Sequence, residues 1–255
     1  MDISTDDIES ERAYALKRFE KISAGLENGE VVDESLYLAH GGLGDYSKEL
    51  GVWSLIEGAT AEAIEWFETA ADHYTESIRE RRVHREIIEK AAWGNEPYAL
   101  ADAMFSAILS GDGDLIEDAA RTALDADETY TEEFPGTTAW YYFAVGLAGV
   151  LIDEPTERER GLSGLRAAHD SLAAKFKQFF AGRITVLESF AANDAARVEE
   201  GLQTMLDDHA DDAPANTTSP DELICVPAMA LLVLARRRGL DVDVESEYLP
   251  DTLPE

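Results

Sequence analysis

The chain has 255 residues, of which 53 are acidic and 21 basic, and its formal net charge is −32 at pH 7. Hydrophobic residues make up 45% of it, which is enough to build a core, so a disordered acidic polymer is excluded. The acidic residues are spread along the whole sequence and leave no basic footprint, so we expect no nucleic-acid partner. Uniform acidity is typical of surfaces adapted to molar salt, and capture of a basic partner is the alternative explanation.

The compartment is predicted from three features. Cys225 is the one cysteine, so no internal disulfide can form, as in a reducing cytoplasm. Residues 1–16 carry acids where a secretory signal needs a basic flank and an apolar core. The apolar runs 139–152 and 223–235 are shorter than the ~18 residues of a membrane span, and the second contains Pro227. We expect a cytoplasmic protein without a membrane partner, and these runs as buried helices.

Taken in chain order, the apolar spacing predicts helices almost throughout. The first helix is expected from about residue 6 to 26, and a second near 34–40. The glycine-rich stretch "HGGLGD" (40–45) predicts a break, after which Asp45 begins the next helix. The glycines lack the spacing and the preceding apolar strand of a phosphate-binding loop.

A repeated unit follows, in which a short polar turn separates an apolar helix from a more amphipathic one. The four turns align at Gly58, Gly111, Asp153 and Asn193, which lie 53, 42 and 40 residues apart. Spacings near 40 residues are typical of stacked helical hairpins. The segment 61–81 resembles the tetratricopeptide pattern, although the irregular period argues against a true repeat array. We therefore predict an all-α fold of about ten helices in stacked hairpins, TPR-like or α-solenoid, as a single domain over residues 1–255.

The last third contains one predicted long loop, 207–222, and a buried helix, 223–238. Arg236, Arg237 and Arg238 occupy the last turn of that helix, where cations complement the negative end of its dipole, and Gly239 suits the left-handed residue that follows. The alternating residues 240–250 then predict a short extended C-terminal tail laid over the body.

No catalytic or metal-binding constellation is legible, so we expect no enzyme and no cofactor. The five histidines form no HExxH motif, and pairs such as His73 with Glu76 favour hydrogen bonding between helices over metal ligation. Cys225 lies in an apolar run, where a thiol is an inert hydrophobe. The arginines of residues 78–90 alternate with glutamates, which favours a salt-bridged helix face over a phosphate site.

The C-terminal residues resemble a known family. The pattern is a buried helix ending in Ala-Arg-x-x-Gly, followed by V-x-V-E-S-x-Y-L-P. Its matching residues are Ala235, Arg236, Gly239, Val242, Val244, Glu245, Ser246, Tyr248, Leu249 and Pro250. Together with the aromatic-rich hairpin 179–209, they are similar to the immunity protein 49 family of polymorphic toxin systems, which is all-α.

The resemblance implies a non-enzymatic protein that binds a cognate toxin and neutralises it. The acidity departs from the bacterial pattern and indicates a halophilic, archaeal-type host. The residues expected to contact the partner are Glu245, Glu247, Tyr248, Phe179 and Phe180. Two alternatives stay open: a helical-repeat scaffold for other protein partners, and a structural role for Tyr248 and Pro250 in pinning the tail to the last helices.

Overall fold

The computed structural model describes residues 5–214 and 217–254, and within these residues the fold is all-α, with no strand. Ten α-helices have twelve residues or more: α1 (Thr5–Glu27), α2 (Leu36–Ile56), α3 (Thr60–Val83), α5 (Glu96–Ser110), α6 (Gly113–Leu124), α8 (Thr138–Leu151), α9 (Pro155–Ser171), α10 (Ala174–Ala192), α11 (Ala195–Asp212) and α13 (Val226–Arg237). Three single-turn helices join them: α4 (Lys90–Trp93), α7 (Tyr130–Glu133) and α12 (Pro220–Leu223). Two short 3₁₀ segments, η1 (Asp33–Ser35) and η2 (Pro135–Thr137), complete the described elements. The predicted all-α class is confirmed.

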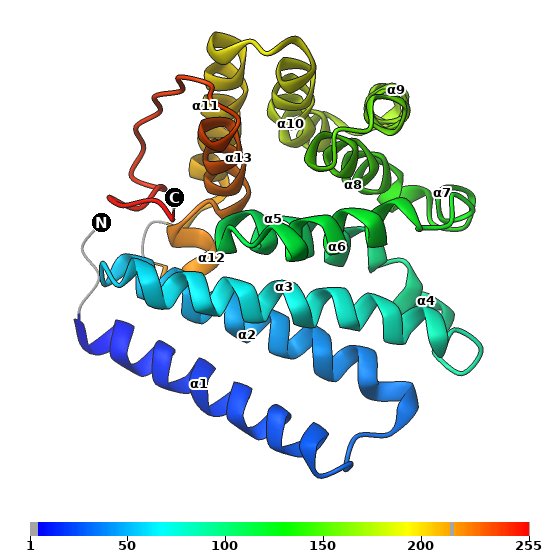
Figure 1. Cartoon of the computed structure of the whole chain (residues 1–255), viewed down its shortest axis with the longest axis vertical. Helices are drawn as coiled ribbons and strands as arrows, with labels where there is room; N and C mark the ends of the chain where they lie inside the picture. Colours follow the sequence, from blue (N-terminus) through cyan, green and yellow to red (C-terminus); the bar gives the residue numbers. More distant parts are fainter. Residues whose placement is uncertain (1–4, 215–216, 255) are drawn as a thin grey trace.

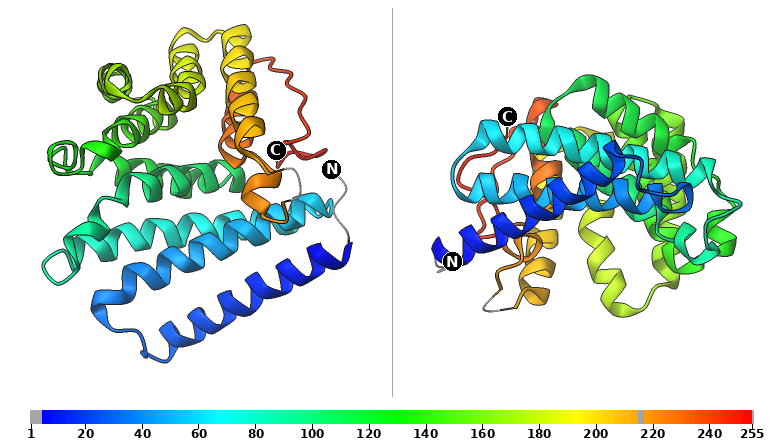
Figure 2. Two further views of the ribbon diagram at one scale, coloured as in Figure 1. Left: turned by 180° about the vertical axis from the view of Figure 1, so that it is seen from behind. Right: turned by 90° about the horizontal axis from the view of Figure 1, so that it is seen from below.

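The helices form two groups that meet along α5 (Figure 1). In one group α1, α2, α3 and α5 lie side by side, and in the other α10, α11 and α13 run crosswise to them (Figures 1 and 2). Buried apolar residues form one continuous cluster across both groups, from Val52 to Val242. The tail after α13 returns along the outside of α13 toward the turn between α2 and α3, so the two ends of the described chain lie on the same side (Figure 1).

The four predicted turns are confirmed. Gly58, Gly111, Asp153 and Asn193 are all left-handed, with φ of 77°, 78°, 53° and 55°. They lie in the turns of the hairpins α2–α3, α5–α6, α8–α9 and α10–α11. Glycine, asparagine and aspartate are the residues that reach this region most readily. The TPR-like arrangement of these hairpins stays a prediction.

The predicted break at "HGGLGD" is wrong, because α2 runs through it without interruption. Here the glycines provide room for a neighbouring helix. A Cβ on Gly44 would lie 2.7 Å from the ring of Tyr74 in α3, and one on Gly41 would lie 3.3 Å from Ser77 Oγ. Asp45 does not begin a helix; its carboxylate accepts a 2.7 Å hydrogen bond from the Tyr74 hydroxyl.

Helix ends in the last third also differ from the prediction. The helix α11 continues to Asp212, so the predicted loop 207–222 contains only a short connection before α12. The buried helix starts at Val226 and places Pro227 in its first turn, where proline is tolerated because that N–H has no helical acceptor. The apolar runs are confirmed as the buried helices α8 and α13.

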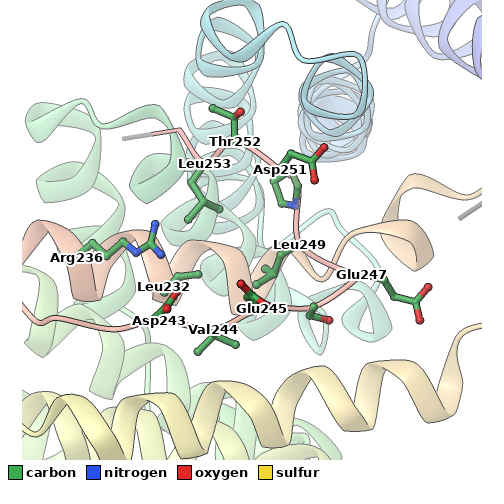
Figure 3. A pocket seen from close by; sticks show the side chains of 12 residues that line it. Leu232, Arg236, Asp243, Val244, Glu245, Glu247, Leu249, Asp251, Thr252 and Leu253 are labelled. Atoms are coloured by element: carbon green, nitrogen blue, oxygen red, sulfur yellow. The ribbon is translucent and has the colours of Figure 1, made fainter.

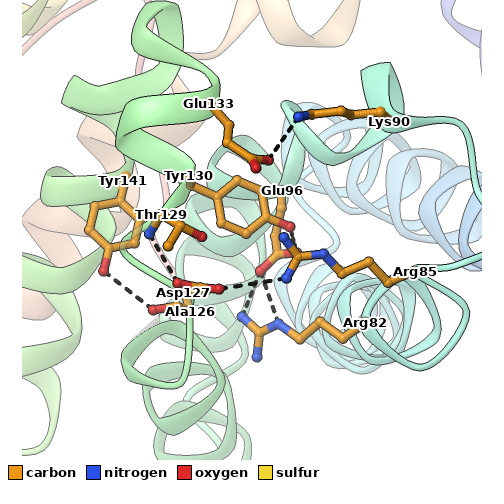
Figure 4. Close-up of polar contacts among 10 residues, drawn as sticks. All are labelled: Arg82, Arg85, Lys90, Glu96, Ala126, Asp127, Thr129, Tyr130, Glu133 and Tyr141. Atoms are coloured by element: carbon orange, nitrogen blue, oxygen red, sulfur yellow. Dashed lines mark hydrogen bonds and ion pairs between the residues drawn. The ribbon is translucent and has the colours of Figure 1, made fainter.

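Two arginines of α3, Arg79 and Arg82, are salt-bridged, and their closest carboxylate partners lie on other elements. Arg82 donates from Nε and Nη2 to the buried Glu96 of α5, at 2.9 and 2.7 Å, and Tyr130 donates to the same carboxylate at 2.7 Å (Figure 4). Arg85, which follows the end of α3, pairs with Asp127 at 3.6 Å. Burial and the adjacent Glu96 carboxylate raise the pKa of the Tyr130 hydroxyl. These bonds tie α3, α5 and α7 together.

Candidate functional site

The C-terminal tail, residues 240–254, forms the candidate site, and Arg236 and Arg237 at the end of α13 position it. Arg236 donates from Nε to the carbonyl of Val242 at 3.2 Å. Arg237 donates to the carbonyl of Pro254 at 3.1 Å and also to that of Ile108 in α5. The tail is therefore held near both of its ends by the helix from which it emerges.

The third arginine, Arg238, was predicted to mark the end of its own helix, and it also bonds to the end of a neighbouring helix. Arg238 donates to the carbonyl of Val150 at 3.0 Å and to the Asp153 carboxylate at 2.8 Å. With the bond from Arg237 to Ile108, this places cations at the C-terminal ends of α5 and α8, where the helix dipole is negative. The arginines thus satisfy the last carbonyls of neighbouring helices, and Gly239 (φ 79°) ends α13 as predicted.

The middle of the tail is pinned at Tyr248. Its carbonyl accepts a 2.9 Å bond from the N–H of Cys225, which precedes α13. Its ring meets His209 of α11 edge to face, with 4.9 Å between the ring centroids. Near the start of the tail, Leu240 and Val242 are buried, as the alternating pattern predicts. The structural role foreseen for Tyr248 is therefore observed.

Between Tyr248 and α13 the tail arches over a hollow of about 780 Å³, which we call the tail hollow (Figure 3). Its lining residues are Leu232, Arg236, Asp243, Val244, Glu245, Ser246, Glu247, Leu249, Pro250, Asp251, Thr252 and Leu253. Leu232, Leu249 and Leu253 lie around its centre, whereas the Glu247 carboxylate points away from it (Figure 3). The hollow thus combines apolar walls with an acidic rim.

A smaller hollow of about 290 Å³ lies on the other side of the tail. Leu249, Pro250, Asp251 and Thr252 line both hollows, and here they face Ile8 of α1 and the turn between α2 and α3. The segment 249–252 is consequently accessible from two sides.

The polar groups of this surface are mainly carboxylates. Its carboxylates are exposed, and one of the tail's amides, Asp243 N–H, donates to Glu199 of α11 at 2.9 Å. Within residues 5–214 and 217–254, no three His, Cys, Asp or Glu side chains are grouped to hold a metal ion. The Cys225 thiol is buried, and desolvation raises its pKa, so it is a poor nucleophile.

The five residues predicted to contact a partner fall into two places. Glu245 and Glu247 are exposed on the tail hollow, and Tyr248 is half-buried beside it. Phe179 and Phe180 lie on α10, away from the tail hollow. Phe180 is 2% exposed and belongs to the core, while Phe179 is half-buried and lines a separate cavity.

The sequence did not indicate that α13 itself lines the site, through Leu232 and Arg236. The signal for Arg236 was present, because three adjacent arginines are unusual in so acidic a chain. No comparable signal marks Leu232, which is one of many leucines in an apolar run.

The structure is that of an all-α protein whose C-terminal tail arches over a hollow lined by both acidic and apolar side chains. A family model described as "Immunity protein 49" matches residues 45–253. The chain therefore belongs to the immunity protein 49 family, and the match spans α3 to α13, most of α2 and nearly the whole tail. No curated protein and no solved structure matches the chain. None of the described helices combines the length and apolar character needed to cross a membrane.

Proposed function

We propose that this protein binds a cognate toxin and neutralises it without catalysing a reaction. Membership of the immunity protein 49 family, over residues 45–253, is the observation that carries the proposal. A toxin-immunity role implies a toxin partner. The proposed setting is the cytoplasm of a salt-adapted cell, with neither nucleic acid nor membrane as partner, and the formal charge of −32 agrees with it.

The tail hollow is the proposed contact surface. Its rim carries Asp243, Glu245, Glu247 and Asp251, which would steer a basic toxin toward it. Its walls include Leu249 and side chains of α13, which offer apolar area to a residue inserted from the toxin. Binding there would cover the toxin's active site or hold the toxin in an inactive state.

The division between rim and walls sets the expected salt dependence. In molar salt the Debye length falls to about 3 Å, so exposed carboxylates steer weakly and the buried apolar contacts supply most of the affinity. We expect the affinity to change only mildly between moderate and molar KCl. A steep loss of affinity with rising KCl would contradict this mechanism.

The experiment begins with capture of the tagged protein from its host's lysate in molar KCl, followed by mass spectrometry. One stoichiometric partner that is toxic alone and harmless when co-expressed with this protein supports the proposal. Several unrelated, weakly bound partners would favour a helical scaffold instead.

Variants then test the surface with the captured partner. Leu253→Ala should weaken binding roughly tenfold at every KCl concentration, because it removes a wall of the tail hollow. The double variant Glu245→Gln, Glu247→Gln should slow association only at low salt. Glu27→Gln with Glu30→Gln is the matched control: it removes two exposed charges outside the region that the family model matches, and it should bind as the wild type does.

A further inference from the structure

A further cavity, of about 260 Å³, lies where α2, α5, α8, α10, α11, α12 and the start of α13 meet. We call it the inner cavity. Its lining residues are Lys48, Asp102, Trp140, Phe179, Arg183, Met205, Asp208, His209, Asp212, Asp221, Ile224, Cys225, Val226 and Pro227. Its lining shares Ile224 with that of the smaller hollow beside the tail, and its His209 contacts Tyr248 of the tail. The inner cavity therefore adjoins the smaller hollow and the tail at Tyr248, but shares no lining residue with the tail hollow.

Aromatic rings and a buried arginine form one wall. Trp140 and Phe179 pack together with 5.4 Å between ring centroids, and the Arg183 guanidinium lies 3.6 Å from the centroid of Phe179. Arg183 is 4% exposed; its Nη1 donates to the Phe179 carbonyl at 2.6 Å, but its Nε has no acceptor among the described residues. Burial lowers the pKa of Arg183 to about 10. A buried donor without an acceptor is costly, so this wall favours an occupant that supplies an oxygen.

The charged residues in the rest of the lining are one lysine and four aspartates. Lys48 pairs with Asp221 at 3.3 Å. Burial raises the pKa of Asp102 to about 6, a value that leaves it largely ionised at pH 7. At the rim, Asp212 is paired with Lys175 at 3.0 Å. With that pair set aside, Asp102, Asp208 and Asp221 face the two cations Lys48 and Arg183, so the lining has one negative charge in excess.

We propose that the inner cavity takes a basic side chain, lysine or arginine, from the partner protein. The proposal rests on the proposed function and adds the chemistry of the partner's anchoring residue. Asp208 and Asp221 would pair with the cationic head, Trp140 would cover the aliphatic stem, and the partner's main-chain carbonyl would accept from Arg183 Nε.

Charge and geometry favour this occupant over the other simple ones. An anion would face more carboxylates than cations. A metal ion would need a close group of three or more ligands, and the described residues hold none. An apolar side chain would leave Arg183 Nε and the excess carboxylate uncompensated.

The test uses N-acetyl-L-argininamide, which has the guanidinium, the stem and the main-chain carbonyls, and its neutral isostere N-acetyl-L-citrullinamide. The signal of the Trp140 indole N–H, followed by ¹⁵N NMR, reports binding in the wild-type protein. We expect a saturable shift with argininamide, with a Kd roughly in the millimolar range typical of a single-residue ligand, and binding at least tenfold weaker with citrullinamide.

Two single-charge variants locate the site. Asp208→Asn and Asp221→Asn should each weaken argininamide binding at least fivefold. Asp207→Asn is the matched control: Asp207 neighbours Asp208 on α11, is exposed and does not line the cavity, so the variant should bind as the wild type does. Equal binding of the two probes, or an equal loss in Asp207→Asn and Asp208→Asn, would overturn the proposal, because binding would then reflect general surface properties.

The probe experiment involves no toxin, so its outcome is separate from that of the proposed function. If the protein neutralises a toxin but its inner cavity does not bind argininamide, the proposal of a basic anchoring side chain is refuted and the proposed function stands. If the inner cavity binds argininamide but the protein protects against no toxin, the proposed function alone is refuted.

Discussion

The contact between α8 and α9 gives the most quantitative prediction. The two helices approach so closely that a Cβ on Gly161 of α9 would lie 2.2 Å from the backbone nitrogen and 2.4 Å from the Cα of Gly146 in α8. Ordinary contacts at a Cβ begin at 3.4 Å, so in Gly161→Ala the helices must separate by about 1 Å. The neighbouring atoms are backbone and cannot rotate away.

The expected magnitude follows from two opposing effects. A separation of that size forfeits a quarter to a half of the dispersion energy along the contact, and overpacking typically costs about 1–3 kcal/mol. Alanine regains about 1 kcal/mol of helix propensity, but the contact is backbone on backbone, so we expect a net loss of about 3 kcal/mol in the free energy of unfolding. For a chain of this size that lowers Tm by roughly 6–12 °C.

Thermal and urea unfolding followed by circular dichroism at 222 nm measures this loss. Gly42→Ala is the matched control: Gly42 also lies inside a helix, but its Cβ would meet Ile22 at an ordinary 3.4 Å. That variant should be more stable by about 0.5–1 kcal/mol. A Tm of Gly161→Ala equal to or above that of the wild type would refute the close packing of α8 and α9.

Three further predictions concern polar contacts, each measured by urea unfolding. Glu96→Ala should lower the free energy of unfolding by about 3 kcal/mol, because it leaves the Arg82 guanidinium without its buried partner. Glu117 is exposed, so Glu117→Ala should lower the free energy of unfolding by less than about 0.5 kcal/mol. Equal losses in the two variants would contradict the role of burial. Arg238→Ala should cost about 1–2 kcal/mol through its lost bonds at the end of α8, and an unchanged urea midpoint would contradict that role. Burial and a neighbouring histidine lower the pKa of His73 to about 4, below its usual 6.5. Its neutral ring therefore contributes stability that is fully present above pH 6.5 and is lost as the pH falls toward 4. His73→Asn should lose less stability than the wild type over that interval, and parallel pH profiles would contradict the assignment.

The hairpins were predictable from sequence because their turns require particular residues. A left-handed φ selects glycine, asparagine or aspartate, and all four aligned positions carry one of these. Glycines inside α2 carry a different meaning. Gly44 accommodates the ring of Tyr74, and the sequence does not reveal which side chain will approach a given glycine.

The candidate surface was predictable only in part. Alternation along the tail placed Val242 inside and Glu245 and Glu247 outside, as observed. The neighbours Phe179 and Phe180 differ in environment because successive residues of a helix point about 100° apart. The inner cavity draws residues from Lys48 to Pro227, and only the folded chain brings them together.

Growth of cells that express the captured partner's toxic domain, with and without this protein, tests the central claim most directly. The account predicts arrest with the toxic domain alone and restored growth when this protein is co-expressed at equal or greater abundance. Arrest that persists while both proteins are soluble, folded and associated would contradict it, because binding would then occur without neutralisation.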